Sequence, residues 1–187
     1  FPYTTLFRSM VWTTRSSRTV YENRWIHVRE DEVTGPDGDG IYGVVRMQQP
    51  SVFVIAIDDR ARLCMVELER YTTGRSLELP SGGSDGEDPL VAAQRELREE
   101  SGVTAARWDH IGRMHALNGI AEAPEHVFLA QDLHIADATA SQREEGIEAV
   151  RWIPFADVLG LVADGTITDG ETIGALAFAG IRLGRFR

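Results

Sequence analysis

Three glutamates, Glu96, Glu99 and Glu100, have the chemistry and spacing to hold a metal ion. They lie at i, i+3 and i+4 of a segment that we expect to be helical, so their carboxylates project from one face. Several hard oxygen ligands without a nearby cysteine or histidine cluster favour Mg²⁺ or Mn²⁺ over Zn²⁺. Such an ion can bridge pyrophosphate oxygens. Taken alone, the spacing also fits a solvated charged face with Arg95 and Arg98 as counter-charges.

The helix that must position these glutamates has clear signals at both ends. Asp88 can accept a backbone hydrogen bond as N-cap, Pro89 suits the first helical position, and Gly102 permits a left-handed stop. Starting from Leu90, apolar residues at i, i+3 and i+7 form a stripe that can be buried. A glycine-rich turn over residues 81–86 precedes this helix.

The remaining elements are mostly strands in the first half and mixed in the second. We expect strands over 18–33 (one or two), 41–47, 51–58, 62–70, 76–80, 108–117, 126–133 and 146–152, and helices over 155–163 and 171–181. Strands with helices before, between and after them indicate a layered α/β or α+β domain. No G-x-G-x-x-G follows a strand, which argues against a parallel dinucleotide-binding fold.

Composition limits the class of partner and the compartment. The chain has 187 residues, with 19 arginines, no lysine, 29 acidic residues and a formal net charge of −10. We therefore expect no nucleic-acid partner. No apolar run is long enough to cross a membrane, and lone Cys64 with no signal segment favours the cytoplasm. Residues 1–9 resemble a translated sequencing adapter, so we expect Met10 to be the natural start and 10–187 to form a single domain.

The spacing around the three glutamates resembles the Nudix box, G-x(5)-E-x(7)-R-E-U-x-E-E-x-G-U, where U is aliphatic. The matching residues are Glu87, Arg95, Glu96, Leu97, Glu99, Glu100, Gly102 and Val103. Eight matches of mixed chemistry make a specific signal. The opening glycine departs from the pattern, because Ser81 stands at its position six residues before Glu87. The loop that starts at Gly82 is therefore one residue shorter than usual.

Weaker flanking matches resemble the ADP-ribose pyrophosphatase-like branch of Nudix hydrolases. They comprise residues 69–71 with 77–82, 119–120 with 125–130, and 145–152, so the resemblance covers nearly all of 18–181. It implies an α/β/α sandwich with a mixed central sheet and extra N-terminal antiparallel strands over 10–47. Relatives in this branch are usually homodimers joined through these strands, and we expect the same here.

The resemblance also implies a metal site. Glu96, Glu99 and Glu100 would hold Mg²⁺, or alternatively Mn²⁺, with the carbonyl of Ser81 as a further ligand. Arg95 would orient the carboxylates through charge-assisted hydrogen bonds. Glu87 would support the same network.

Hydrolysis also needs a base and a substrate-binding surface. The base candidates are Glu145, its neighbour Glu144 and a box glutamate. Arg70 and Glu78 match the substrate-binding side of the branch, where Arg70 could clamp a phosphate or could instead pair with Glu69 or Glu78. Tyr71, Trp25 or Tyr21 could stack on the nucleotide base of the substrate.

The activity implied by the resemblance is Mg²⁺-dependent hydrolysis of the pyrophosphate bond of a nucleoside diphosphate derivative. ADP-ribose or another nucleotide sugar would give AMP, or the corresponding nucleotide, and a sugar phosphate. Two alternatives stay open. One is a Nudix-fold sensor that binds such a ligand without turnover, and the other is a Nudix hydrolase of a dinucleotide polyphosphate or of reduced nicotinamide dinucleotide.

Overall fold

The computed structural model describes residues 11–136 and 139–186, so the adapter-like segment 1–9 and Met10 lie outside the described residues. Backbone contacts divide the chain into two compact units, one running up to Gln48 together with Leu117–Ala123, and the other comprising Gln49–Ala116 and the chain from Pro124 onward. We expected one domain over 10–187. The structure gives the N-terminal strands a compact unit of their own, and each unit is described separately.

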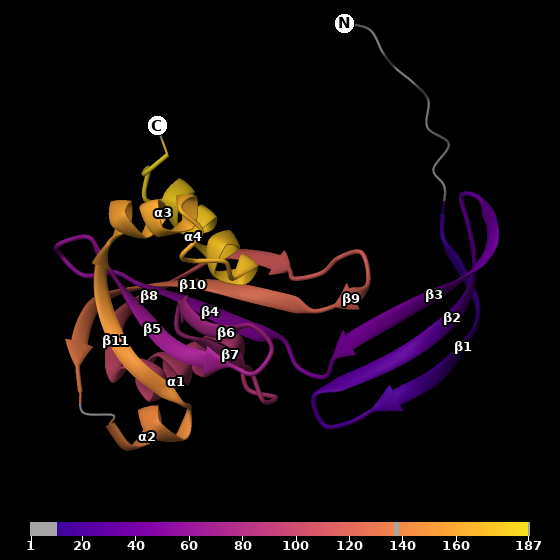
Figure 1. The fold of residues 1–187 in the computed structure, drawn as a ribbon, viewed down its shortest axis with the longest axis horizontal. Coiled ribbons are helices and arrows are strands. Elements are labelled where there is room, and N and C mark those ends of the chain that lie inside the picture. The colour runs from indigo at the N-terminus through magenta and orange to yellow at the C-terminus, as the bar shows by residue number, and fades with distance from the viewer. Residues whose placement is uncertain (1–10, 137–138, 187) are drawn as a thin grey trace, which may run out of the picture. The chain divides into compact units, whose positions relative to one another are not determined.

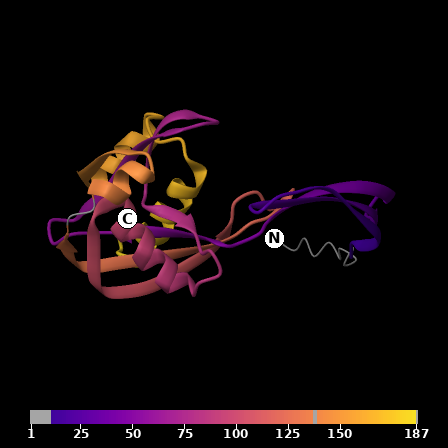
Figure 2. The ribbon, with the colours of Figure 1, turned by 90° about the horizontal axis from the view of Figure 1, so that it is seen from below.

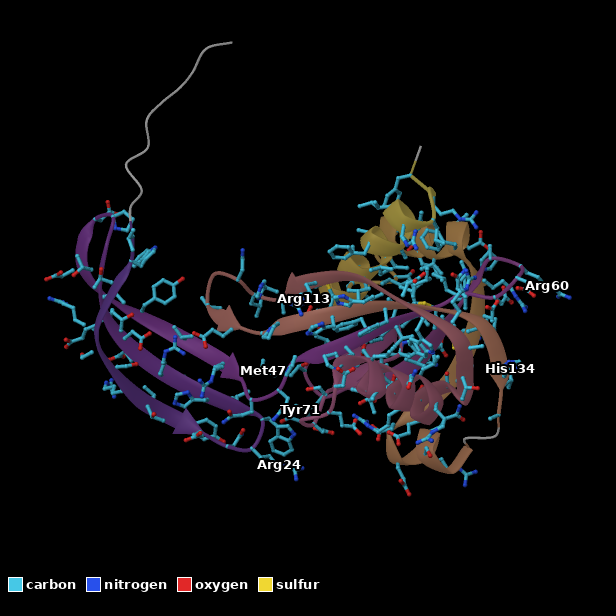
Figure 3. The ribbon with its side chains drawn as sticks, turned by 180° about the vertical axis from the view of Figure 1, so that it is seen from behind. Arg24, Met47, Arg60, Tyr71, Arg113 and His134 are labelled. Atoms are coloured by element: carbon cyan, nitrogen blue, oxygen red, sulfur yellow. The ribbon has the colours of Figure 1, made fainter. Side chains whose placement is uncertain are left out.

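The N-terminal unit is one four-stranded sheet in the order β1-β2-β3-β9. Its strands are β1 (Thr13–Glu22), β2 (Ile26–Gly35), β3 (Gly38–Met47) and the two-residue β9 (Ala121–Glu122). The first three are antiparallel neighbours, and β9 runs parallel to β3. The side chain of Asn23 forms the first turn by accepting the N–H groups of Trp25 and Ile26, at 2.8 and 2.9 Å. In Figure 3, Arg24 marks this turn.

The larger unit contains two sheets, in the orders β7-β4-β10-β8 and β11-β5-β6. Its strands are β4 (Ser51–Ala56), β5 (Arg62–Arg70), β6 (Gly74–Glu78), β7 (Ser81–Gly83), β8 (Val103–His115), β10 (Pro124–Ile135) and β11 (Ile147–Pro154). Its helices are α1 (Pro89–Ser101), α2 (Thr139–Glu144), α3 (Phe155–Ala163) and α4 (Gly170–Arg182). Strand β10 is parallel to β4 and antiparallel to β8, so the sheet is mixed, as predicted.

Two apolar cores lie on opposite faces of these sheets, and β4 contributes to both. Alternate β4 residues point to opposite sides of a sheet. Phe53 and Ile55 therefore join the core formed with α3 and α4, whereas Val52 and Val54 join the core formed with α1. Figures 1 and 2 show α3 and α4 on one side of the strands and α1 on the other. The predicted α/β/α sandwich is confirmed.

Helix α1 begins and ends as its sequence predicts. Asp88 accepts the N–H of Leu90 at 2.9 Å, and Gly102 adopts a left-handed φ of 71° while its N–H reaches the carbonyl of Arg98. Leu97 has no exposed surface. Because Leu97 is buried, its packing fixes the position of α1, and with it Glu96, Glu99 and Glu100, relative to the sheet. No helix among the described residues is long and apolar enough to cross a membrane.

Candidate active site

The box glutamates differ in burial. Glu96 and Glu100 are only 6% and 5% exposed, and the side chain of Glu99 is 25% exposed. The first two lie at the edge of the buried face of α1, where strand β7 passes over them. A Cβ on Gly82 of β7 would overlap the Glu96 carboxylate. The glycine-rich turn is therefore required by a close approach between its backbone and the metal-ligating glutamates that the sequence predicts.

Arg95 is the centre of a network of carboxylates. Its guanidinium donates to Glu87 at 2.9 Å, to Glu96 at 2.8 Å and to Glu99 at 3.2 Å. It also donates to the carbonyl of Gly83 at 2.9 Å, which ties α1 to β7. Burial acts against the cation, but the hydrogen bond to Glu87, the charge of Glu96 and the hydrogen bonds to Glu99 and Glu96 raise the pKa of Arg95. Arg95 and Glu87 thus contact each other and the box, and their roles as orienting group and support stay predictions.

Ser81 contacts the third box glutamate. Its backbone N–H donates to Glu100 Oε2 at 2.9 Å. Strand β7 is fixed there by its antiparallel pairing with β4, in which Ser81 lies opposite Phe53. The structure thus brings Ser81 to the site through its amide. The role of its carbonyl as a metal ligand stays a prediction.

Burial perturbs the acidity of two of the carboxyls. It raises the pKa of Glu96 to about 7 against the opposing charge of Arg95, and nearby Glu145 and Glu99 add to the rise. Burial raises the pKa of Glu100 to about 8 despite the hydrogen bond from Ser81, and Glu96 and Glu145 again contribute. Carboxyls whose charge is this costly favour a bound cation.

Glu145, the first candidate for the base, lies close enough to raise the pKa of both buried box glutamates through its charge. It directly follows α2, where its N–H donates to the carbonyl of Ser141 at 3.0 Å, and Gly146 turns the chain with a φ of 72°. Glu144, its neighbour, is also exposed but is not among the groups whose charges act on Glu96 and Glu100. Which of the two acts as the base stays a prediction.

Arg70 pairs with Glu78 rather than with Glu69. Two nearly parallel bonds join them, at 3.1 Å from Nε and 2.5 Å from Nη2, and Glu78 is buried. This ion pair raises the pKa of Arg70, with further charge effects from Glu100 and Asp169. Pairing of Arg70 with Glu78 was one of the alternatives that the sequence left open. The pair leaves Arg70 at the wall of a pocket, so binding of substrate by this residue stays a prediction.

The pocket has a volume of about 360 Å³ and lies beside the box. It is lined by Ser51, Phe53, Arg70, Thr72, Thr73, Glu78, Ser81, Gly82, Gly83, Asp169 and Glu171. Sequence reasoning missed five of these polar residues, Ser51, Thr72, Thr73, Asp169 and Glu171. Asp169 carried only the signature of a helix N-cap, which it is, accepting the N–H of Thr172 at 2.8 Å.

The three aromatic candidates for stacking on the nucleotide base belong to different compact units. Tyr71 lies on the turn between β5 and β6, fully exposed, and is labelled in Figure 3. Trp25 and Tyr21 belong to the N-terminal unit. The stacking role stays untested for all three.

The donor set at the box fits a divalent cation. Among the described residues, no three His, Cys, Asp or Glu side chains already converge as a cation site. Arg95 forms ion pairs with Glu96 and Glu99. The oxygens are nevertheless hard ligands on one helix face, and two of them are buried with raised pKa values. Glu96, Glu99 and Glu100 would hold the ion after a small rearrangement of the Arg95 bridge.

Substituting Gly82 tests the close approach of β7 to α1. A Gly82→Ala variant should displace the Glu96 carboxylate and weaken Mg²⁺ affinity by roughly tenfold to a hundredfold, as for other groups that support metal ligands. Calorimetric titration with Mg²⁺ measures this. Gly83→Ala is the matched control, because a Cβ there meets only ordinary contacts. Equal affinities in the two variants would contradict the close approach.

The stability of the metal-free protein should fall as the pH rises from about 5 to 8.5. Glu96 and Glu100 have folded-state pKa values raised to about 7 and 8, so their contribution is complete below the unfolded value near 4.5 and is lost through 7 to 8. We expect Mg²⁺ to raise the Tm more at pH 8 than at pH 5.5. Thermal melts in chelator and in Mg²⁺ test this.

Glu125, outside the box, also has a raised pKa and would add to the same pH dependence. A Glu100→Gln variant therefore isolates the contribution of the box to the pH dependence of stability. The variant should lose part of the pH dependence that the native metal-free protein shows. An unchanged pH dependence in this variant would refute the assignment.

Comparison with known proteins agrees with this geometry. The model of the NUDIX domain family matches residues 47–175, and the nucleoside diphosphate sugar hydrolase N-terminal domain matches residues 12–45. An ADP-ribose pyrophosphatase of Mycobacterium tuberculosis is 32% identical over 171 residues, which cover 90% of this chain and 80% of that protein.

Two further proteins are similar over most of the chain. The CMP-5'-(N-acetyl-N-hydroxy-3-aminopropyl)phosphonate hydrolase of Streptomyces rubellomurinus is 30% identical, covering 92% of this chain and 84% of that protein. The crystal structure of an ADP compounds hydrolase superposes with a TM-score of 0.77 at 22% identity, over 94% of this chain and 96% of that one. The last similarity shows the fold.

Proposed function

The chain belongs to the Nudix hydrolase family, and from this premise we propose that it hydrolyses the pyrophosphate bond of a nucleotide sugar in a Mg²⁺-dependent reaction. ADP-ribose is the foremost substrate, with AMP and ribose 5-phosphate as products. The observation that carries the proposal is the pair of buried box carboxyls, Glu96 and Glu100, beside the pocket that contains Arg70. Similarity to an ADP-ribose pyrophosphatase supports the choice of substrate.

The box residues bind and orient. Glu96, Glu99 and Glu100 would hold the divalent cation, which when bound would neutralise charge on the pyrophosphate and on the leaving phosphate. Arg95 holds Glu96 and Glu99 through hydrogen bonds of 2.8 and 3.2 Å. The amide of Ser81 holds Glu100. Each carboxylate is thus positioned by a second group from this chain.

Glu145 would act as the base. As the water oxygen bonds to phosphorus, Glu145 takes the proton that the water loses, and the P–O bond to the leaving phosphate breaks. Its position just beyond α2, close to two buried carboxyls, supports this role.

Arg70 would bind the phosphates from the pocket. Its bond pair with buried Glu78 fixes the plane of the guanidinium at the pocket wall. A planar guanidinium suits a phosphate with two acceptor oxygens. Glu78 is then a positioning residue for Arg70.

Product analysis tests the proposed function. The Met10-start protein, with and without Mg²⁺, is incubated with ADP-ribose and a panel of other nucleotide sugars, dinucleotide polyphosphates and reduced nicotinamide dinucleotide, and products are separated by ion-exchange chromatography. Metal-dependent AMP from ADP-ribose is the expected result. Turnover of another compound of the panel instead would identify that compound as the substrate. No turnover of any compound by folded, metal-loaded protein would overturn the proposal.

We also propose that the protein is a homodimer joined through its N-terminal unit. Val20, Tyr21 and Ile41 on its strands and Trp25 on the turn between β1 and β2 are each more than half exposed, and a partner surface would cover them. Light scattering at micromolar concentration should give twice the chain mass of 20.7 kDa. A Trp25→Ser/Ile41→Ser variant should shift this mass toward the monomer. A monomeric mass for the native protein would refute the proposal.

A further inference from the structure

A short stretch of backbone joins two parts of the candidate active site. Glu78, at the end of β6, holds the guanidinium of Arg70 at the pocket wall. Ser81, at the start of β7, holds the carboxylate of Glu100 through its backbone N–H at 2.9 Å. Residues 78–81 are named here the linking segment. Its position determines where both of these side chains lie.

The backbone of the linking segment offers one N–H group between its two ends. Pro80 has no N–H, so Leu79 is the sole backbone donor between Glu78 and Ser81. Residues 78–80 are buried, and a buried N–H group needs a partner from the protein itself. The group that accepts the N–H of Leu79 is therefore important for the position of the segment.

That group is the side chain of Thr172 in α4. Its Oγ1 accepts the N–H of Leu79 at 3.2 Å, although the two residues are 93 positions apart in the chain. Neither residue has any exposed surface. The next residue, Pro80, accepts the N–H of Val54 of β4 with its carbonyl at 2.9 Å. The linking segment is thus held between α4 and β4.

Thr172 is itself fixed by the start of its helix. Its N–H donates to the N-cap side chain of Asp169 at 2.8 Å, and α4 packs against β4, β8 and β10. Packing alone does not explain a hydroxyl at this position. Valine has the same shape and would fill the same space, but the N–H of Leu79 would then lose its acceptor. The hydroxyl therefore serves the linking segment rather than the apolar core.

We propose that Thr172 is a positioning residue that holds the linking segment in place for both parts of the active site. Through Ser81 it fixes Glu100 for the metal, and through Glu78 it fixes Arg70 for the phosphates. Thr172 does not line the pocket, so it acts through the backbone of the segment and not on the substrate. The role rests on the proposed function, because it acts on the metal-ligating and phosphate-binding residues named there.

Two variants of Thr172 test the role. Thr172→Val keeps the shape of the side chain without the hydroxyl, and Thr172→Ser keeps the hydroxyl. Dissociation constants are measured by calorimetry for Mg²⁺ alone and for ADP-ribose with Ca²⁺, whose looser coordination suits binding rather than turnover. Thr172→Val should weaken both affinities by about tenfold, the lower end of the range for groups that support metal ligands. Thr172→Ser should stay within about threefold of native, because the acceptor is kept.

Hydrogen exchange of the Leu79 amide, followed by NMR in the metal-free protein, tests the contact itself. The amide should exchange faster in Thr172→Val than in the native protein or in Thr172→Ser, because only valine removes its acceptor.

Val158→Thr is the matched control for a general loss of stability. It makes the reverse substitution at a fully buried position of α3, in the core that α3 shares with α4, and Val158 does not line the pocket. This variant should keep native affinities for Mg²⁺ and ADP-ribose.

Native affinities in Thr172→Val, or an equal loss in Val158→Thr, would overturn the positioning role. A Thr172→Ser variant as weak as Thr172→Val would also overturn it. If Thr172→Val does not fold, Thr172→Cys takes its place, because a thiol is only a weak acceptor. The same comparisons with Thr172→Ser and Val158→Thr then apply.

The outcomes separate this proposal from the proposed function. Weakened affinities in Thr172→Val, without turnover of any nucleotide sugar by the native protein, would keep the positioning role and overturn the hydrolytic proposal. Hydrolysis of ADP-ribose by the native protein, with native affinities in Thr172→Val, would do the opposite. If the native protein binds Mg²⁺ but not ADP-ribose, the Mg²⁺ affinities alone decide the role.

Discussion

Replacing Glu99 and Glu100 together by glutamine will lower kcat/KM for ADP-ribose by at least about 10³-fold, which corresponds to roughly 4 kcal/mol of lost transition-state stabilisation. The variant keeps only one of the three proposed metal-ligating carboxylates, Glu96, so it should also lose Mg²⁺ binding in calorimetry. Glutamine has the size of glutamate, and the buried site loses a charge that is costly there. The metal-free variant should therefore melt no lower than the metal-free native protein at pH 8.

The matched control for this variant is Asp59→Asn/Asp157→Asn. Both residues are exposed, and neither lies in α1 or lines the pocket. This control removes the same number of charges and should keep native kcat/KM and Mg²⁺ affinity. Native-like activity in Glu99→Gln/Glu100→Gln would show that the box does not hold the catalytic metal.

Glu145→Gln should lower kcat by about 10²- to 10⁴-fold with little change in KM, the size expected for loss of a general base. Removal of its charge should also lower the pKa values of Glu96 and Glu100, because Glu145 contributes to the rise of both. Steady-state kinetics over a pH series measures both effects. A lower pKa would appear as a shift in the pH at which Mg²⁺ affinity rises.

Glu144→Gln provides the comparison for the base. Glu144 is the adjacent acid in sequence and is exposed, and it is not among the main causes of the raised pKa values of Glu96 and Glu100. It should remain close to native. The reverse result would assign the base to Glu144, and a small effect of both variants would leave a box glutamate as the base.

The local signals in the sequence predicted helix α1 well. Asp88, Pro89 and Gly102 determine the ends of α1 through backbone hydrogen bonds within a few residues, and the structure reproduces these ends. The existence of β4 also follows from local sequence, because its continuous apolar run is buried on both faces in two different cores. The sandwich could therefore be predicted from periodicity and from the resemblance to the Nudix box.

The pocket could not be predicted in this way. Asp169 and Glu171 follow Glu125 by more than forty residues, and only the packing of α4 against β10 and β4 brings them together. The two-residue strand β9 likewise exists only because it pairs with β3, far earlier in the chain. Such contacts leave no periodic pattern in either segment. The same reason explains why the compact N-terminal unit was expected as strands but not as a separate unit.

The need for Gly82 also arose from packing. The sequence showed a shortened glycine-rich turn, whereas the structure shows that the backbone at Gly82 lies against the Glu96 carboxylate. Arg95 was expected to orient the box, and its bonds to Glu87, Glu96, Glu99 and Gly83 give that role a geometry. The motif spacing indicated the carboxylate partners of Arg95, whereas its hydrogen bond to Gly83 of β7 is seen only in the structure.

Hydrolysis of ADP-ribose in H₂¹⁸O, followed by mass spectrometry of the products, tests the central claim most directly. Water attack on phosphorus predicts one ¹⁸O atom in the phosphate of either AMP or ribose 5-phosphate, only when Mg²⁺ is present and not with Glu99→Gln/Glu100→Gln. Label on a sugar carbon, or product formation that persists in chelator and in that variant, would contradict the account.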